Sequence, residues 1–298
     1  MKMTIGTSRF EQNQLTLETI DLQPPLDKIM RSELAKLRVS QYYFDEPLFD
    51  EYEATTVRAT WDFTAAESIV DDGDEVLDLG CGDGRLLLHL AEQRSLGKSV
   101  GIDIAGIAIK RFQAEIERTG SSELEARLGD IFALPEDIRA RYYDVVTFGD
   151  ATVNFVLDDG KLEELLLTAN NQLRDETSQV MIAVFADGTP EQLAFMDKRC
   201  TVVPFRPSSG RSALIWWAYK YDPNRLIMHR SAFVQYGWDD DGNIEGVVCD
   251  LRDRMWTPSA ITPIAARAGL RVEQIIDSYV QDGAAIGMGT AIMILRRA

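Results

Sequence analysis

Cysteine, histidine and long apolar runs are all scarce in this chain. Its 298 residues include two histidines and three cysteines, Cys81, Cys200 and Cys249. An odd number of cysteines at such wide spacing forms neither a disulfide framework nor a zinc-ligand pattern, so we expect no metal and a reducing, cytoplasmic environment. No run of eighteen apolar residues and no basic-then-apolar start occurs, and neither a membrane span nor a signal peptide is expected.

Basic residues are also in the minority. The chain has 31 Lys and Arg against 48 Asp and Glu, which gives a formal net charge of -17. Because nucleic-acid binding depends on basic patches, a nucleic-acid partner is not expected. The charge is compatible with a cationic partner, such as an amine or a basic peptide, although acidic residues also serve simply to keep a protein soluble.

Strands and helices alternate through the middle of the chain. We expect strands at 75–80, 98–103, 124–128, 143–149 and 178–185, and helices at about 84–95, 105–118 and 158–173. This alternation predicts an α/β fold with right-handed crossovers and a mostly parallel sheet covered on both faces.

The two ends of this α/β region have a different pattern. Pro24 and Pro25 predict the start of a helix that continues to Leu37, and a second helix is expected from about Arg58 to Ile69. After residue 185, the segment 199 to 256 has the pattern of strands joined by turns. A helix from Thr257 to Gly269 and strands at 271–280 and 288–296 follow.

These patterns divide the chain into three units. We expect an N-terminal extension with cap helices at 1–57, an α/β core at 58–185 and 257–298, and an inserted antiparallel β lobe at 186–256.

One short stretch carries most of the functional signal. In "VLDLGCGDGRLLLHLAE", residues 76 to 92, a buried strand is followed by Gly80, Gly82 and Gly84 and then by an amphipathic helix. Glycines allow positive φ and a close approach of the backbone to a ligand, and the helix N-terminus offers N–H groups to an anion. A dinucleotide fingerprint would place the third glycine one position later.

This turn resembles motif I of the class I S-adenosylmethionine-dependent methyltransferases. Three further motifs follow in the family's order: "VGIDIA" with Asp103, "LGDIFALP" with Asp130, and "YDVVTFGDATVNF". The resemblance implies a Rossmann-like sheet of order 3-2-1-4-5-7-6 with one antiparallel strand. It also implies S-adenosyl-L-methionine as the cofactor, with S-adenosyl-L-homocysteine as its product.

The resemblance further implies which residues hold the cofactor. The glycine turn would surround its methionine end, and Asp78 or a nearby carbonyl would receive the ammonium group. Asp103 would accept the ribose hydroxyls, and Asp130 the adenine amine. The full set of implied cofactor residues is Tyr52, Asp78, Gly80, Cys81, Gly82, Gly84, Asp103, Ile104, Asp130, Ile131 and Gly149.

Two segments are candidates for contact with the methyl acceptor. "QYYFDEPLFDEYE" resembles the N-terminal helix of sugar N-methyltransferases and offers Tyr43 as a catalytic residue, or else its aromatics pack two helices together. In the loop after the fourth strand, Asp150 would orient a cationic amine. Asn154 resembles an asparagine of glycopeptide-type N-methyltransferases. The alternative is that Asn154 caps the next helix and Asp150 is a turn residue.

The inserted lobe is the third candidate. Aromatic residues crowd one of its strands: Trp216, Trp217, Tyr219 and Tyr221. They fit either the lobe's own core or the contact of a homodimer. His229 is a candidate general base or else a packed histidine. Because Arg230, Arg252 and Arg254 are basic, the alternative of an acidic methyl acceptor stays open.

The sequence therefore predicts a methyltransferase that acts on an amine of a natural product or peptide. The overall plan is similar to glycopeptide N-methyltransferases and to daptide-type methyltransferases of ribosomal peptides. Two alternatives stay open: an O-methyltransferase acting on a small-molecule hydroxyl or carboxylate, and a non-catalytic partner subunit that binds S-adenosylmethionine.

Overall fold

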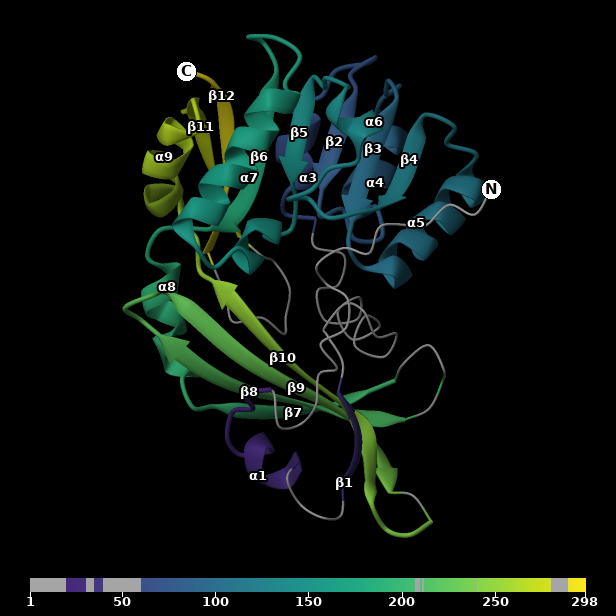
Figure 1. Ribbon diagram of the computed structural model, residues 1–298, viewed down its shortest axis with the longest axis vertical. Coiled ribbons are helices and arrows are strands. Elements are labelled where there is room, and N and C mark those ends of the chain that lie inside the picture. Colours follow the sequence, from purple (N-terminus) through teal and green to yellow (C-terminus); the bar gives the residue numbers. More distant parts are fainter. Residues whose placement is uncertain are drawn as a thin grey trace.

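The computed structural model describes residues 20–30, 35–39, 60–206, 210, 212–238, 240–279 and 289–298. Within these ranges the chain forms two sheets, a seven-stranded core sheet with helices on both faces and a five-stranded lobe sheet (Figure 1). None of the described helices combines the length and the apolar character needed to cross a bilayer.

The core sheet is built from short apolar runs. All four residues of β2 are buried, which is the pattern of a strand covered on both faces. The strands are β2 (Val76–Leu79), β3 (Ser99–Asp103), β4 (Leu124–Leu128), β5 (Val145–Phe148), β6 (Gln179–Phe185), β11 (Leu270–Tyr279) and β12 (Gly289–Arg297).

The order of these strands confirms the predicted fold class. They follow one another as β4-β3-β2-β5-β6-β12-β11, which is the order 3-2-1-4-5-7-6. The pairs β4-β3, β3-β2, β2-β5 and β5-β6 are parallel. β12 runs antiparallel to both of its neighbours, as expected for the last strand of the final hairpin.

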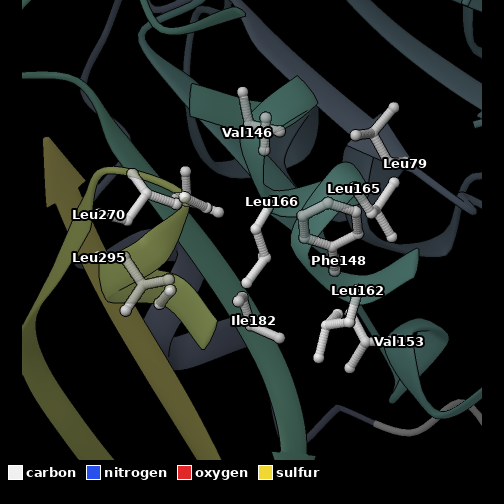
Figure 2. Close-up of a cluster of buried hydrophobic side chains, with 14 of the residues drawn as sticks. Leu79, Val146, Phe148, Val153, Leu162, Leu165, Leu166, Ile182, Leu270 and Leu295 are labelled. Atoms are coloured by element: carbon white, nitrogen blue, oxygen red, sulfur yellow. The ribbon is translucent and has the colours of Figure 1, made fainter. Parts of the chain in front are cut away.

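Helices cover the two faces of the core sheet. The helices are α3 (Phe63–Glu67), α4 (Arg85–Gln93), α5 (Gly106–Thr119), α6 (Glu136–Arg139), α7 (Asp159–Gln172), α8 (Thr189–Gln192) and α9 (Pro258–Arg267), with 3-10 turns η1 (Thr152–Phe155) and η2 (Leu193–Met196). On one face, α7 and α9 pack in a cluster with β5 and β6 (Figure 2). On the other, α3, α4 and α5 form a second cluster. Leucines at helical spacing give α7 its apolar stripe.

Four of the five strands of the lobe sheet pair antiparallel: β7 (Cys200–Phe205), β8 (Ala213–Asp222), β9 (Ile227–Trp238) and β10 (Ile244–Arg254). The predicted strand character of residues 199 to 256 is thus confirmed. One face of this sheet buries a cluster that includes Trp217, Val234 and Cys249. The other face packs against residues 20–30. Alternate residues along each strand supply the two faces, as the pleat requires.

The N-terminal segment differs from the prediction. The helix α1 (Leu26–Met30) is followed by a strand, β1 (Ala35–Val39), so the expected continuation of the helix to Leu37 is wrong. β1 pairs parallel with β10, which otherwise would leave unpaired backbone groups at the sheet edge. In Figure 1, α1 lies on the side of the lobe sheet that faces away from the core sheet. The described part of the extension therefore belongs to the lobe.

A close contact between helix α5 and the glycine turn can be tested by substitution. Gly84 has a φ of +80°, and a Cβ at this position would overlap the ring of the buried Phe112. We expect Gly84→Ala to lower the free energy of unfolding by about 2–4 kcal/mol, from left-handed strain and overpacking together. Urea denaturation measures this change.

Gly120→Ala is the matched control. Gly120 has a φ of +72°, but no heavy atom lies within 4 Å of its Cβ position. This control should show only the backbone cost of about 1–2 kcal/mol. An equal loss in the two variants would show that the contact with Phe112 does not constrain the turn.

Candidate functional site

Four loops leave the core sheet at one edge. β2, β3, β4 and β5 are parallel, so their carboxyl ends all lie on the same side of the sheet. Asp103 ends β3, and the loops after the other three strands carry Gly80–Gly84, Asp130 and Gly149. The lobe is on this side too, since it follows the carboxyl end of β6 (Figure 1). The structure thus gathers the predicted cofactor residues of the core at one edge.

The glycine turn is tied to the neighbouring strand by a carboxylate. The backbone N–H of Gly82 donates to Asp103 Oδ2 at 2.8 Å, and the N–H of Ala105 donates to Asp103 Oδ1 at 2.7 Å. Burial raises the pKa of the Asp103 carboxyl, and these backbone donors partly offset the rise. A Cβ on Gly82 would meet no heavy atom of the described residues within 4 Å. The outer side of the turn is therefore open to a ligand, as the cofactor would require.

Asp78 is a buried carboxyl directly before this turn. Its side chain accepts a hydrogen bond from Thr147 Oγ1 at 2.7 Å, and the residue is 2% exposed. Burial raises the pKa of Asp78 to about 7, although the bond from Thr147 and the charge of Arg85 both oppose the rise. Near neutral pH the carboxyl is therefore poised between its two forms. A cation at this edge would favour the ionised form.

The pair of Asp62 and Arg85 joins three segments at the same edge. Arg85 Nη1 and Nη2 donate to the two carboxylate oxygens of the fully buried Asp62 at 2.7 and 2.6 Å. Asp62 Oδ2 also accepts from the backbone N–H of Asp150 at 3.0 Å. The segment before α3, the first residue of α4 and the loop after β5 are held together in this way. The sequence analysis missed this pair, because nothing in the spacing of Asp62 and Arg85 relates them.

Four more of the predicted cofactor residues lie at or beside these strand ends: Cys81, Ile104, Asp130 and Ile131. Asp130 Oδ1 accepts from the N–H of Phe132 at 2.9 Å, and Ile131 packs against the core cluster. Ile104 is half-buried beside Asp103. Burial raises the pKa of the Cys81 thiol well above its usual value, so this thiol is not a nucleophile at neutral pH.

The loop after β5 has an unusual backbone. Asp150 and Ala151 both have positive φ, +41° and +60°, which non-glycine residues seldom adopt. Thr152 Oγ1 donates to the carbonyls of Gly149 and Gly80, at 2.8 and 3.2 Å. Asp150 Oδ1 accepts from Trp61 Nε1 at 3.3 Å. These contacts hold the strained loop beside the glycine turn.

Asn154 follows within the same loop, in η1. It is 4% exposed, and its side-chain Oδ1 has no hydrogen-bond partner among the described residues. Leaving a buried acceptor unpaired costs about 1–3 kcal/mol. Such an atom in a loop at the edge of the sheet is suited to accept a hydrogen bond from a ligand. The alternative of Asn154 as a helix cap does not hold, because Asp158 caps α7.

The structure does not bring His229 to this edge. Its Nε2 lies 2.5 Å from Asp250 Oδ1 and its Nδ1 lies 3.0 Å from Gln23 Nε2. Ser231, on the same face of β9, accepts a hydrogen bond from the backbone N–H of Gln23. His229 therefore connects residues 20–30 to the far face of the lobe sheet. We do not retain it as a candidate base.

The lobe arginines are matched by carboxylates. Arg230 Nε lies 2.6 Å from Oδ2 of the buried Asp253, and Arg254 Nη1 lies 2.5 Å from Asp159 Oδ1. Arg252 is half-exposed, 3.6 Å from Asp21 on the far face. The three arginines that left an acidic acceptor open thus lie close to carboxylates of the chain itself. The predicted residues Tyr43 and Tyr52 lie outside the described residues.

Comparison with known proteins agrees with this geometry. A family model described as a methyltransferase domain matches residues 70–193. A protein-lysine N-methyltransferase of Saccharolobus islandicus is 41% identical over 51 residues, which are 17% of this chain and 32% of that protein. The chain thus aligns with only about a third of the length of this relative.

Two solved structures share most of the architecture. The CcbJ methyltransferase from Streptomyces caelestis aligns with a TM-score of 0.63 at 17% identity, over 87% of this chain and 98% of its own. The glycopeptide N-methyltransferase MtfA, solved with S-adenosyl-L-homocysteine, aligns with a TM-score of 0.57 at 13% identity, over 93% and 99%. At these identities the likeness shows the fold.

The domain match and the fold lead to the same conclusion, and both agree with S-adenosylmethionine as the expected cofactor. Residues 70–193 match the methyltransferase-domain model, and the chain has the Rossmann-like fold of the class I S-adenosylmethionine-dependent methyltransferases.

Proposed function

We propose that this protein transfers the methyl group of S-adenosylmethionine to an amine nitrogen of a natural product or peptide. The observation that carries the choice of an amine is the unpaired, buried Oδ1 of Asn154 at the edge of the core sheet. The similar proteins named above, a protein-lysine N-methyltransferase and a glycopeptide N-methyltransferase, support the same class of acceptor.

The chain's own residues would hold the cofactor at its polar groups. The Gly80–Gly84 turn has an open outer side, and the buried carboxyls of Asp78 and Asp103 lie on either side of it. The bound cofactor supplies an electrophilic methyl group. These carboxyls suit its net positive charge, because an opposite charge stabilises a buried carboxylate. Asp130 and Ile131 stay the proposed contacts of the adenine.

Asn154 discriminates between classes of acceptor. A neutral primary or secondary amine has at least one N–H to donate to Oδ1 while its lone pair attacks the methyl carbon. A carboxylate has no hydrogen to donate, and an attacking hydroxyl must give up its only one. A carboxylate would also be repelled by the ionised forms of Asp78 and Asp103 beside the turn. An amine therefore fits this edge better than either oxygen acceptor.

Proximity can account for most of the chemistry. A positioned amine needs little beyond orientation and the removal of one proton after transfer. Asp150 stays the proposed residue that orients a cationic amine, since its carboxylate lies in the same loop as Asn154. Tyr43 and Tyr52 stay proposals from the family resemblance.

The first test concerns the cofactor. Asp103→Ala removes the acceptor for the N–H groups of Gly82 and Ala105 and the proposed contact to the ribose. We expect S-adenosylmethionine to bind more weakly by about 1.5–3 kcal/mol, or roughly ten- to hundredfold in Kd. Isothermal titration measures the Kd. Glu92→Ala, exposed on α4, is the control and should bind normally. An unchanged Kd in the Asp103 variant would place the ribose elsewhere.

The second test uses the raised pKa of Asp78. Below about pH 7 this carboxyl carries a proton, which the binding of a cation must displace, whereas above pH 7 it is already ionised. The Kd of the wild type should therefore fall as the pH rises from about 6 to 8 and then level off. Asp78→Asn should lack this dependence. Titration of the cofactor itself affects both proteins equally, so the ratio of the wild-type Kd to the Asp78→Asn Kd reports the contribution of Asp78 alone. A constant ratio would contradict the proposed contact.

The third test concerns the acceptor. Peptide amines and amino sugars, each paired with its hydroxyl analogue, are incubated with S-adenosylmethionine, and mass spectrometry detects each added methyl group. We expect methylation of an amine, and Asn154→Leu should lower its kcat/KM by about tenfold or more without changing the Kd of the cofactor. Asn154→Asp, which keeps acceptor oxygens, is the matched control. Methylation of the hydroxyl partners alone would overturn the choice of an amine.

A further inference from the structure

We propose that Arg254 is a positioning residue that holds Asn154 in place by fixing the carboxyl end of η1 to the lobe. The inference rests on the role of Asn154 in the proposed function. Arg254 would thus act through Asn154, and not through the direct contact with an acidic acceptor that the sequence left open as an alternative.

The amino end of η1 is fixed to the glycine turn. Thr152 Oγ1 donates to the carbonyls of Gly80 and Gly149, and the N–H of Thr152 donates to the carbonyl of Gly149 at 3.0 Å. The N–H of Asn154 then donates to the carbonyl of Ala151 at 2.9 Å. This end of η1 is therefore anchored to the proposed cofactor site.

The carboxyl end of η1 is fixed to the end of lobe strand β10. Trp256 Nε1 donates to the carbonyl of Val156 at 2.7 Å. Arg254 Nη1 donates to the carbonyl of Leu157 at 3.1 Å and to Asp159 Oδ1 at 2.5 Å. The Arg254 guanidinium carbon lies 3.8 Å from the centroid of the Trp256 ring, which is itself 1% exposed. Two lobe residues thus fix three of the four positions that follow η1.

Asn154 depends on these anchors because nothing else described fixes its amide oxygen. Oδ1 has no hydrogen-bond partner in the described part of the chain, so we infer its position from the backbone of η1 and from the packing on either side. Val153 and Val156 are both buried in the core cluster that contains Trp256. Figure 2 shows Val153 beside Leu162 of α7, so the core side of η1 is set by packing. The polar side is set by Thr152 at one end and by Arg254 with Trp256 at the other.

The ion pair itself is a poor source of stability. Asp159 is 59% exposed, and a pair of this kind contributes about 0–1 kcal/mol. The bond from Arg254 to the carbonyl of Leu157 is more sheltered, because the Arg254 side chain is 22% exposed. Loss of Arg254 should therefore change the local geometry of η1 more than it changes global stability.

The test is hydrogen–deuterium exchange over residues 150–158, which needs no acceptor. Arg254→Met keeps an unbranched apolar stem over Trp256 and removes Nη1, the donor of both hydrogen bonds. We expect exchange at the amides of Thr152, Asn154 and Val156 to rise about tenfold. Arg254→Lys keeps one charged donor and should restore most of the protection.

Arg267→Met is the matched control. Arg267 pairs with Glu163, also on α7, at 2.7 Å, and both side chains are at least a third exposed. This variant should leave exchange over residues 150–158 at the wild-type rate. Unchanged exchange in Arg254→Met, or an equal rise in the control, would overturn the proposed anchor.

A kinetic measurement separates positioning from simple stabilisation. With the amine that the panel identifies, Arg254→Met should raise the KM for the amine or lower kcat by about tenfold, while the Kd of S-adenosylmethionine stays within about twofold of wild type. Faster exchange with wild-type kinetics would overturn the positioning role. If no amine is methylated by the wild type, the proposed function fails, and the exchange result still decides whether Arg254 anchors η1.

Discussion

The hydrogen bond from the Gly82 N–H to the Asp103 carboxylate fixes the turn on which the proposed cofactor site depends. It connects the loop after β2 to the end of β3, and the same carboxylate accepts from Ala105 at the start of α5. On the other side of the turn, Gly84 lies against the Phe112 ring of α5. The turn is thus held between a carboxylate and an aromatic ring, and its outer side stays open.

The same edge concentrates negative charge in buried surroundings. Burial raises the pKa of both Asp78 and Asp103, while Arg85 is committed to Asp62 by two short hydrogen bonds. Buried carboxyls of this kind are costly unless a cation or a donor meets them. A cofactor with net positive charge would offer a cation to these carboxyls, and an amine acceptor would offer N–H donors. The chain's overall charge of -17 favours the approach of such ligands.

The lobe contributes to this edge through its attachment to the core. Its far face binds residues 20–30 through Gln23, Ser231 and His229, so these groups are occupied in holding the lobe together. The lobe returns to the core at Trp256, whose carbonyl accepts from the N–H of Phe185 at the end of β6. That return places Arg254 and Trp256 against the loop that carries Asn154. A loop between the cofactor turn and the lobe is thus anchored to both.

Local patterns in the sequence predicted most elements and their order along the chain. A strand buried on both faces of a parallel sheet is a short apolar run, and the glycine turn is a pattern of five residues, so both can be recognised locally. The glycine turn, Asp103 and Asp130 could be found in this way, and the sheet order followed from the family resemblance. Contacts between segments that are distant in the sequence have no such local pattern. Only the tertiary structure decided that 35–39 forms a strand. The spacing of apolar residues there suggested a helix, but the backbone of 35–39 pairs with the edge strand β10, which is distant in the sequence. The tertiary structure also decided that Asp62 meets Arg85, that His229 faces away from the core, and that Arg254 pairs with Asp159, since the choice of partner among 48 acidic residues depends on which strands become neighbours.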